Sequence, residues 1–397
     1  MRYIRFSSVA AAVATIFTCA AGGTAAAGDD SSTPVPCYTA ALTNAISSAS
    51  SGDTLSLARD CTYHLTTPFS TGEGLPTISQ PLTIRGNGAT IVRDGNATPA
   101  FRIFHVLAGG DLRLQDLTVR GGNATLSTGT GNGGGILVDS NGKLRLVGVD
   151  VIDNTASLNG GGVALSTNAT ANIRRSWVAF NNALNGAGLH SQGTLTVDNS
   201  EIGRNHAQVL GGGLLQNGSI AFIHASIISR NTANLSGGGV LNTGGASTTI
   251  SESKIANNTT SGVAGGGLVN AGATLTLEKS EVSGNVVGGP GGDGGGIHNS
   301  NVGTGPNTVI GTLYLKGSKV IRNSANGPNA GTNLSQAGGI FNSSGSVTLD
   351  HSYVRNNAST SAPGGLRTNV PITLTDSSIT HNVPTNCVPF PITGCTD

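Results

Sequence analysis

Charged residues are scarce in this chain of 397 residues. Asp, Glu, Lys and Arg together make up 10% of it, and the formal net charge is +1. Nucleic-acid binding and attachment to an anionic membrane surface both need clustered positive charge, so we predict neither. Intrinsic disorder is also excluded, because a disordered chain is poor in hydrophobic residues and this chain contains 37% of them.

Aromatic residues are scarce as well, at 4% with a single Trp, whereas Gly accounts for 61 of the 397 residues. An ordinary protein contains about half that share of Gly. Here Gly, Asn, Ser and Thr separate short aliphatic runs, a pattern typical of many short strands joined by tight turns. The composition therefore favours an all-β fold.

The first residues predict an export signal. Arg2 and Arg5 form a positive segment, an apolar run follows over 9–17, and the small residues 25–27 offer a cleavage site. The apolar run is too short to span a bilayer. We therefore predict a signal peptide over 1–27 and a secreted mature chain without a transmembrane anchor.

The cysteines indicate disulfide bonds. Cys19 lies in the signal segment, and the large residues before it disfavour a lipoprotein. The other four, Cys37, Cys61, Cys387 and Cys395, form two close pairs at opposite ends of the chain, and an even number in an exported protein is typical of disulfides. Three pairings are open. We favour Cys37 with Cys61 and Cys387 with Cys395, because each bond then staples one end.

A glycine block followed by an aliphatic residue recurs along the chain. The complete copies are Gly133–Ile136, Gly160–Val163, Gly211–Leu214, Gly237–Val240, Gly265–Leu268 and Gly294–Ile297. The last glycines of successive copies, with a degenerate copy ending at 188, lie 25 to 29 residues apart. A propeller blade needs about 40 residues or more, so this shorter period indicates a solenoid.

A second motif keeps the same period. Its clearest copy is Leu275-x-Leu277-x-x-Ser280-x-Val282-x-x-Asn285. The L-x-L alternation has a period of two residues, which predicts a strand with one buried face. One repeat cannot bury a core alone, so successive repeats must stack and pair their strands in parallel, about 4.8 Å apart. The sequence thus predicts a single right-handed parallel β-helix, an all-β solenoid.

The Asn that ends this motif predicts a structural ladder at a turn. Each side-chain amide should bond to its copies in the coils above and below. The ladder comprises Asn154, Asn181, Asn205, Asn231, Asn258, Asn285, Asn323, Asn357 and Asn382.

Both ends of a solenoid need caps, since an open coil exposes unpaired strand edges. Near the N-terminus, an apolar stripe predicts a short capping helix. Its residues are Tyr38, Ala41, Leu42, Ala45, Ile46 and Ala49. At the other end Pro384, Pro389 and Pro391 withhold backbone donors from any further strand. Two longer connections, 301–312 and 325–336, should project as loops.

These features divide the chain into four parts. We predict a signal peptide over 1–27, an N-terminal segment with the capping helix over 28–80, the parallel β-helix coils over 81–383, and a C-terminal cap over 384–397.

These residues resemble the right-handed parallel β-helix proteins of the pectin-lyase-like superfamily. Within it, the paired motifs Ile228–Asn231 and Gly238–Val240 resemble the repeats of bacterial polymorphic outer-membrane proteins. The predicted helix followed by Ser51–Leu55 is similar to the capping entry of many secreted β-helix proteins. The resemblance spans residues 37–390, roughly, and implies the fold more strongly than the function.

The sequence departs from this superfamily in two respects. Polymorphic outer-membrane proteins end in a translocating β-barrel, and no barrel-length segment follows the last repeat, so we do not expect self-transport. Pectin-degrading hydrolases carry Asn-x-Asp, Asp-Asp and Gly-His-Gly signatures. This chain has Asp-Asp only at Asp29 and Asp30 and has no Gly-His-Gly, and the Asp, Arg and Lys set of the calcium-dependent lyases is not recognisable.

Outward positions should also stack into columns. The position after the motif's Ser predicts a column of Asp150, Trp177, Glu201, Ile227, Lys254, Glu281, Lys319 and Tyr353, beside a column of Arg174, Asp198 and His224. Asp150 and Glu201 would lie two coils apart, about 9–10 Å, with Trp177 between them. Inverting glycosidases hold two carboxyl groups about 6.5–9.5 Å apart, so these three are the candidate catalytic residues. A solvated face with incidental charges is the alternative interpretation.

Other candidate sites are simpler. Arg204 and Arg230 occupy one repeat position in neighbouring coils, where they could bind an acidic glycan or only keep the surface soluble. Gly288–Asp293 matches the start of a calcium nonapeptide, GGxGxD, but a single copy within a longer period favours a flexible turn. The cysteines and histidines lack ligand spacing, so we predict no metal and no cofactor.

Two functions stay open. The favoured hypothesis is a secreted, non-catalytic and monomeric β-helix scaffold that binds a polysaccharide, another cell-envelope component or a protein. It rests on a regular ladder without a recognisable catalytic set. The alternative is an extracellular polysaccharide hydrolase or lyase, which rests on the superfamily resemblance and on the face with Asp150, Trp177 and Glu201.

Overall fold

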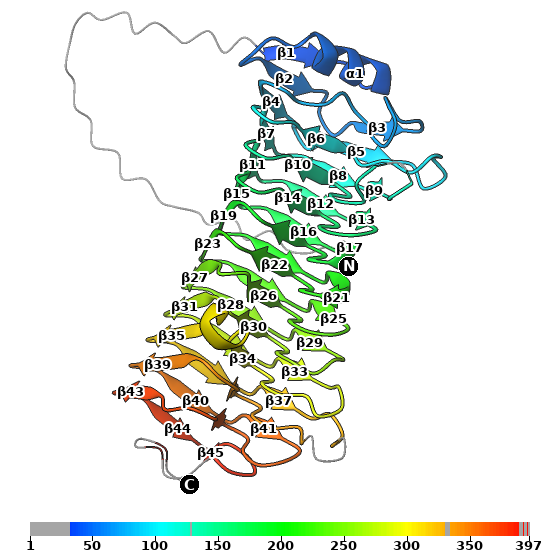
Figure 1. The fold of residues 1–397 in the computed structure, drawn as a ribbon. Helices are drawn as coiled ribbons and strands as arrows, with labels where there is room; N and C mark the ends of the chain where they lie inside the picture. Colours follow the sequence, from blue (N-terminus) through cyan, green and yellow to red (C-terminus); the bar gives the residue numbers. More distant parts are fainter. Residues whose placement is uncertain (1–31, 128, 330–333, 389–391, 393–394, 396–397) are drawn as a thin grey trace, which may run out of the picture. The chain divides into compact units, whose positions relative to one another are not determined.

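The computed structural model describes residues 32–397 with the exception of 128, 330–333, 389–391, 393–394 and 396–397. The predicted signal peptide over 1–27 lies outside the described residues. Ser32–Asp397 forms one compact unit, in which each turn of the chain adds strands to a stack of parallel sheets (Figure 1). This is the predicted right-handed parallel β-helix.

Four parallel sheets, which we label A, B, D and E, make up the described coils. Sheet A has 13 strands: β1 (Ser32–Val35), β2 (Thr54–Leu57), β4 (Pro81–Arg85), β7 (Asp111–Gln115), β11 (Lys143–Val147), β15 (Thr170–Arg174), β19 (Thr194–Asp198), β23 (Ile220–His224), β27 (Ser247–Ser251), β31 (Thr274–Glu278), β35 (Thr312–Lys316), β39 (Ser346–Asp350) and β43 (Thr373–Thr375).

Sheet B follows sheet A in each coil and has 12 strands: β3 (Thr62–Leu65), β5 (Thr90–Arg93), β8 (Thr118–Arg120), β12 (Asp150–Ile152), β16 (Trp177–Ala179), β20 (Glu201–Gly203), β24 (Ile227–Ser229), β28 (Lys254–Ala256), β32 (Glu281–Ser283), β36 (Lys319–Ile321), β40 (Tyr353–Arg355) and β44 (Ser378–Thr380).

Sheet E comes next and has 9 strands: β9 (Asn123–Ala124), β13 (Thr155–Ala156), β17 (Asn182–Asn185), β21 (His206–Leu210), β25 (Thr232–Ala233), β29 (Thr259–Thr260), β33 (Val286–Val287), β37 (Ser324–Ala325) and β41 (Ala358–Ser359). Sheet D closes the coil with 11 strands: β6 (Phe104–Val106), β10 (Ile136–Val138), β14 (Val163–Leu165), β18 (Leu189–Ser191), β22 (Leu214–Asn217), β26 (Val240–Thr243), β30 (Leu268–Ala271), β34 (Ile297–Ser300), β38 (Ile340–Asn342), β42 (Leu366–Thr368) and β45 (Cys387–Val388).

The core forms because like residues stack on like. In β31 the buried Leu275 and Leu277 alternate with more exposed residues, and the register places them on Leu313 and Leu315 of the next coil. Each coil therefore extends one continuous column of aliphatic side chains. Burying such columns removes apolar surface from water along the whole stack, which no single coil could do.

The glycine blocks precede sheet D, where the chain turns sharply. Gly237 adopts a left-handed φ of +68°, which Gly reaches without steric cost. At Gly239 an added Cβ would lie 2.5 Å from the Gly267 carbonyl oxygen and 3.0 Å from the Nδ2 atom of Asn258. The block is therefore required both for the turn and for the close approach of the Asn ladder.

The Asn ladder runs along the corner between sheets B and E. At a typical step, Asn258 donates from Nδ2 to Oδ1 of Asn285 (3.0 Å) and to the carbonyl of Ile228 (2.9 Å), and its Oδ1 accepts from the backbone N–H and Nδ2 of Asn231. The same bonds link every predicted member from Asn154 to Asn382. The sequence predicts this arrangement, since the turn repeats with the coil.

The N-terminal cap is α1 (Thr39–Ser48), which buries Leu42 and Ile46 against the end of the core. Tyr38 was predicted to share this apolar face, but it lies before the helix in extended backbone and is 58% exposed. The disulfide between Cys37 and Cys61 ties the start of this cap to the first coil. Within the described part of the chain, no helix is long and apolar enough to cross a membrane.

The coils begin earlier than predicted. Strands β1 and β2 already pair within sheet A, and β3 pairs with β5 in sheet B. The boundary at residue 81 is therefore wrong. Residues 32–80 lack the glycine block and the ladder Asn, so the motifs could not reveal these first coils.

The C-terminal cap also differs from the prediction. Between Pro384 and Pro389, the short strand β45 still pairs with β42, because Cys387 and Val388 both retain backbone donors. Cys387 and Cys395 are joined in the favoured pairing. Pro389 and Pro391 lie outside the described residues.

The two long connections behave differently. In 301–311, Val302 pairs with Val309 in an antiparallel bridge around the 3-10 helix η1 (Gly305–Asn307), and its apolar side chains are exposed. The connection 325–336 does not simply project, because Ser335 and Gln336 are buried and bond to Gly292 and Asp293 of the previous coil. Residues 330–333 of this connection lie outside the described part.

Candidate functional site

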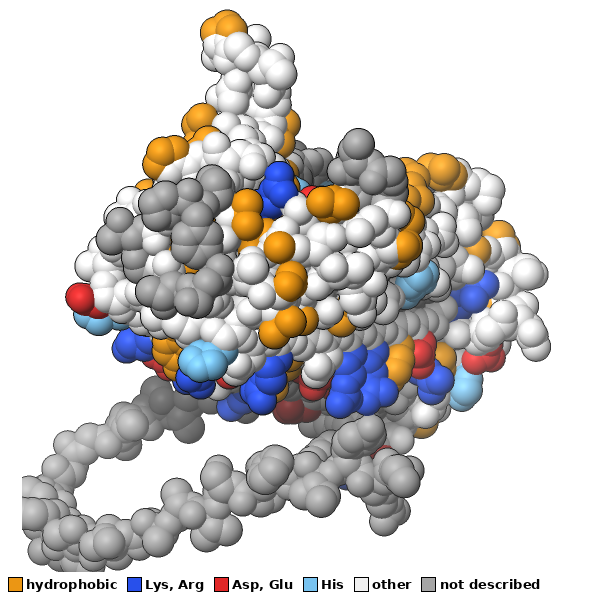
Figure 2. Space-filling view, turned by 90° about the horizontal axis from the view of Figure 1, so that it is seen from below, with side chains coloured by type: hydrophobic (Ala, Val, Ile, Leu, Met, Phe, Trp, Pro, Cys, Tyr) orange, Lys and Arg blue, Asp and Glu red, His pale blue; other side chains and the backbone are white. Residues whose placement is uncertain are grey.

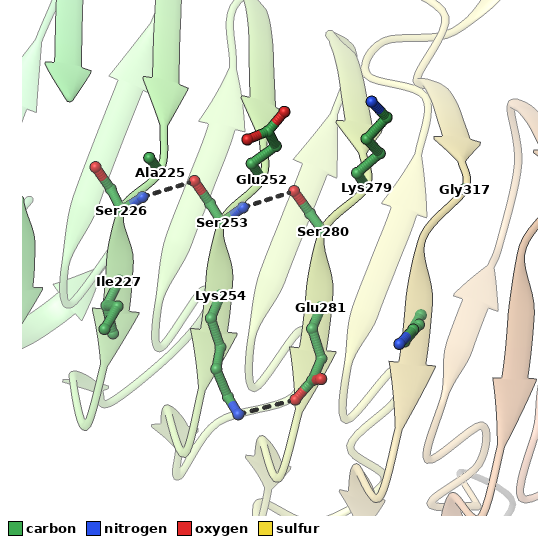
Figure 3. Close-up of a pocket in the computed structure, with 11 residues that line it drawn as sticks. Ala225, Ser226, Ile227, Glu252, Ser253, Lys254, Lys279, Ser280, Glu281 and Gly317 are labelled. Atoms are coloured by element: carbon green, nitrogen blue, oxygen red, sulfur yellow. Dashed lines mark hydrogen bonds and ion pairs between the residues drawn. The ribbon is translucent and has the colours of Figure 1, made fainter. Parts of the chain in front are cut away.

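A groove lies along the corner where sheet A turns into sheet B. It has a volume of about 300 Å³ and crosses successive coils (Figure 3). Its lining comprises Ala225, Ser226, Ile227, Glu252, Ser253, Lys254, Lys279, Ser280, Glu281, Gly317 and Lys319. We call these residues the corner groove.

The chain makes this corner in one residue. Ala225, Glu252 and Lys279 each adopt a left-handed φ between 46° and 48°, which swings the following strand onto sheet B. The Ser that follows each of them forms the floor of the groove. Ser253, for example, donates from Oγ to the carbonyl of Ser251 and accepts from the backbone N–H of Ser226. The floor hydroxyls therefore belong to the fold and hold the corner rigid.

The walls of the corner groove carry charges of both signs. On the sheet B side, Lys254 Nζ lies 2.9 Å from Glu281 Oε1, while Glu252 and Lys279 stand on the opposite side (Figure 3). The hydroxyl of Ser283 donates to Glu281, and this bond, with the charge of Lys254, holds the pKa of Glu281 below its usual range despite partial burial. The groove thus offers fixed donors and acceptors with little net charge.

The same corner is hollowed again towards the C-terminal end. A second depression, of about 560 Å³, is lined by His351, Ser352, Tyr353, Leu374, Asp376, Ser377 and Ser378. Its Ser352 and Ser377 continue the serine floor. In Figure 2 the charged side chains gather along one edge of the view, while the rest of that face is mostly uncharged. Along the corner the serine floor repeats, whereas the outward side chains differ from coil to coil.

The predicted outward column is present in register. Asp150 pairs with Trp177, Trp177 with Glu201, and the column continues through Ile227 and Lys254. Asp150 and Glu201 are therefore separated by two strand spacings, about 9.6 Å along the backbone. The carboxylate of Glu201 accepts a hydrogen bond from Ser229 Oγ (3.3 Å). The three candidate catalytic residues share one face, and their column is the one that borders the corner groove.

Trp177 leans across its own strand towards the next corner. Its ring lies 5.5 Å from that of Phe180, edge to face at 85°. Arg204 places its guanidinium 5.4 Å from the centre of the Phe180 ring. Arg230 occupies the same turn position as Arg204 in the next coil, and both have left-handed backbone. Sequence analysis found both arginines but not Phe180, although Phe180 precedes the ladder residue Asn181 as Arg204 precedes Asn205.

The adjacent column predicted on sheet A is also in register. Arg174 lies beside Asp198, with Nε 3.3 Å from Oδ2, and His224 follows in the next coil, where it bonds to Ser251. These exposed groups neutralise one another. They form a polar face next to the groove and do not converge on a common point.

Sequence analysis missed a buried charge cluster near the N-terminal end. His105 Nδ1 lies 3.0 Å from Glu73 Oε1, and its Nε2 lies 3.0 Å from Asp139 Oδ2. Arg102, which is almost fully buried, also donates to Glu73. Burial alone would lower the pKa of His105, but the hydrogen bond and charge of Glu73, with the charge of Asp139, outweigh it and raise that pKa.

This cluster could not be seen in the repeats. Phe104 stacks in register with Ile136, so residues 101–103 stand where later coils carry the glycine block. The first coil of sheet D is therefore unrecognisable from its motif. The cluster fastens the irregular segment around Glu73 to two coils, which is a structural role.

Asp293, the last residue of the GGxGxD segment, accepts a hydrogen bond from the backbone N–H of Gln336. Burial raises its pKa to about 6, against that hydrogen bond and the charge of Arg367. It anchors the end of a loop. Among the described residues, no group of three or more His, Cys, Asp or Glu side chains could hold a metal ion.

Comparison with known proteins bears on the fold. The model of a family described as "Right handed beta helix region" matches residues 134–313. Among solved structures, the chain is similar to the periplasmic alginate epimerase AlgG, at 10% identity and a TM-score of 0.38 over 86% of this chain and 83% of that chain. A double mutant and a single mutant of the same enzyme match at 9% and 12% identity, with TM-scores of 0.36 and 0.37 and the same coverage.

A comparison with curated proteins finds no match. The family match over 134–313 and the four all-parallel sheets agree with each other. This chain is a right-handed parallel β-helix.

Proposed function

We propose that this protein is an exported, non-catalytic β-helix that binds an extended, neutral polysaccharide along the corner groove. The observation that carries the proposal is the groove itself, which crosses successive coils and presents paired charges such as Lys254 and Glu281. Alternating donors and acceptors suit the hydroxyl groups of a neutral sugar chain. A strongly anionic polymer would require a surplus of cations.

Binding without cleavage is favoured by the ionisation of one carboxyl group that lines the groove, Glu281. Glycoside hydrolysis needs one carboxyl group that stays protonated to act as an acid. The pKa of Glu281 is instead lowered by Ser283 and Lys254, so this carboxylate is an acceptor and not a proton donor. Export is supported by the two disulfides, since such bonds persist in oxidising compartments, and by the predicted signal peptide.

The test is direct. Isothermal titration calorimetry of the protein with mixed-linkage glucan, xylan and mannan should show binding to at least one of them, whereas polygalacturonate and alginate should bind more weakly. Replacing exposed Lys279 in the groove (Lys279→Ala) should weaken binding about tenfold, because a charged hydrogen-bond donor is removed. Lys143→Ala, equally exposed on sheet A outside the groove lining, is the matched control. Binding that Lys279→Ala leaves unchanged, or no binding by the wild type, would reject the proposal.

A second candidate function is polysaccharide cleavage, and the shared face of Asp150, Trp177 and Glu201 favours it. The same polysaccharides, incubated with the protein, would then yield new reducing or unsaturated ends. Glu201→Gln should abolish that product while it leaves binding intact. Absence of product with every polysaccharide bound would remove this candidate.

A further inference from the structure

The strongest unexplained feature of the surface is Phe180. It is 42% exposed and has a left-handed φ of +57°. A bulky side chain in this region of φ is a steric outlier, and such a conformation persists only where the surrounding structure imposes it. The corresponding turn position is left-handed in other coils as well, where it holds Gly284, Asn257 and Asn356 but also Asp153, Arg204, Arg230, Arg322 and His381. The turn itself therefore imposes this backbone, and among these residues Phe180 carries the largest apolar side chain.

Core packing does not account for Phe180. Its neighbours are the ring of Trp177, which is itself partly exposed, and the guanidinium of Arg204. Both contacts lie on the outer face of sheet B, above the buried Ala179. The aliphatic core is on the other side of the sheet, where Val178 points. The aromatic pair therefore lies outside the aliphatic columns of the core.

The surroundings of the pair are those of a sugar subsite. The two rings, which meet edge to face at 85°, form an L-shaped apolar platform in which the C–H groups of one pyranose ring can pack. Arg204 and the exposed Arg230 supply donors one coil apart, about 4.8 Å. Glu201, whose carboxylate is held by Ser229, supplies an acceptor on the same face. Donors and acceptors beside a platform match the hydroxyl groups that radiate from a neutral sugar.

The platform is continuous with the corner groove. Trp177, Glu201, Ile227 and Lys254 are consecutive rungs of one column, and the last two line the groove. A sugar chain lying in the groove would reach Trp177 two coils beyond Ile227, about 10 Å further on. We propose that Phe180 and Trp177, flanked by Arg204 and Glu201, form an aromatic subsite for one pyranose unit of a neutral glycan. This inference rests on the proposed function.

The first test separates binding from stability. Phe180→Asn removes the platform and places at this turn a residue that accepts left-handed φ. We expect its thermal unfolding midpoint to be unchanged or to lie up to about 3 °C above that of the wild type. The affinity for the hexasaccharide that the wild type binds best, cellohexaose, xylohexaose or mannohexaose, should fall about tenfold. His381→Asn makes the same exchange at the equivalent turn position of the last coil, where φ is also +57°, and should leave binding unchanged.

The second test uses Trp177 as a reporter. It is the only Trp in the chain, so any change in tryptophan emission on titration with the hexasaccharide reports this subsite. We expect a saturable change with the same dissociation constant as calorimetry, and its loss in Phe180→Asn.

The outcomes are distinguishable. Calorimetric binding without a change in Trp177 emission, or unaltered binding by Phe180→Asn while Lys279→Ala is impaired, would refute the subsite and leave the corner groove as the binding site. A lower unfolding midpoint for Phe180→Asn would show that Phe180 is retained for packing, which also refutes the inference. Preference for hexagalacturonate over the neutral hexasaccharides would reassign Arg204 and Arg230 to an acidic sugar. No binding by the wild type would reject the proposed function together with the subsite.

Discussion

Replacing Asn258 by Ala should destabilise the protein far more than any surface substitution. Its side chain is fully buried. Its amide donates to Asn285 and to the Ile228 carbonyl, and it accepts twice from Asn231, all at 2.9–3.0 Å. Asn258→Ala removes these four hydrogen bonds at once, in a place where the neighbouring coils leave no direct route for water.

The magnitude follows from the groups left behind. The Asn231 backbone N–H and one hydrogen of its amide lose their acceptor, and the Ile228 carbonyl loses a donor. A buried polar group without a partner costs about 1–3 kcal/mol. For three such groups the free energy of unfolding should therefore fall by about 3–9 kcal/mol, a large part of the stability of an ordinary domain.

The neighbouring residue provides a matched control. Asn257 is exposed and has a φ of +56°, so Asn257→Gly should change the free energy of unfolding by no more than about 0.5 kcal/mol. Urea unfolding followed by far-UV circular dichroism measures both variants. If Asn258→Ala unfolds at the same urea concentration as Asn257→Gly, the ladder is not a source of stability and the reasoning is refuted.

Three further predictions concern the titrating groups and one disulfide. Burial lowers the pKa of His190 and His298 to about 4. Each neutral imidazole therefore contributes stability above about pH 6.5, and this stability is lost as the pH falls towards 4. The thermal unfolding midpoint should fall over that pH range, and it should fall less in His190→Asn. The raised pKa of His105 acts in the opposite sense, because its stabilisation is complete below about pH 6.5 and is lost as the pH rises through the raised pKa. His105→Gln should therefore lack this decline of the unfolding midpoint at higher pH. If the midpoint of His105→Gln depends on pH as that of the wild type does, His105 is not the group responsible. Reducing the bond between Cys37 and Cys61, which are 24 residues apart, should lower the stability of this end of the protein by about 3 kcal/mol through loop-closure entropy. The loss can be measured as reduced hydrogen-exchange protection in α1, and Cys37→Ser should reproduce it.

The repeat made most of the fold predictable. A strand with a period of two, a glycine block and a ladder Asn recur with one period, so the residues of one coil determine the register of all. That is why the column from Asp150 to Tyr353 could be written from sequence and is present in the structure. The prediction failed where the repeat is degenerate, in the first coils before residue 81 and at β45.

For the candidate site, too, the sequence predicted what the repeat determines and nothing beyond it. Trp177, Glu201, Arg204 and Arg230 could be placed because they occupy repeat positions. Phe180 occupies the same repeat position as Arg204, but its contacts with the Trp177 ring and the Arg204 guanidinium depend on side-chain directions that only the structure shows. The buried group around His105 was equally hidden, because Glu73 lies in a segment without any motif.

The sequence by itself determined the architecture of this protein, because parallel stacking converts a one-dimensional period into a three-dimensional register. Only the tertiary structure decided which outward residues enclose a groove. The left-handed turn at Ala225, Glu252 and Lys279 sets the angle between sheets A and B, and that angle, together with the pairing of Lys254 and Glu281, determines the shape of the corner groove. Side-chain direction at a corner depends on backbone angles that composition and spacing do not encode.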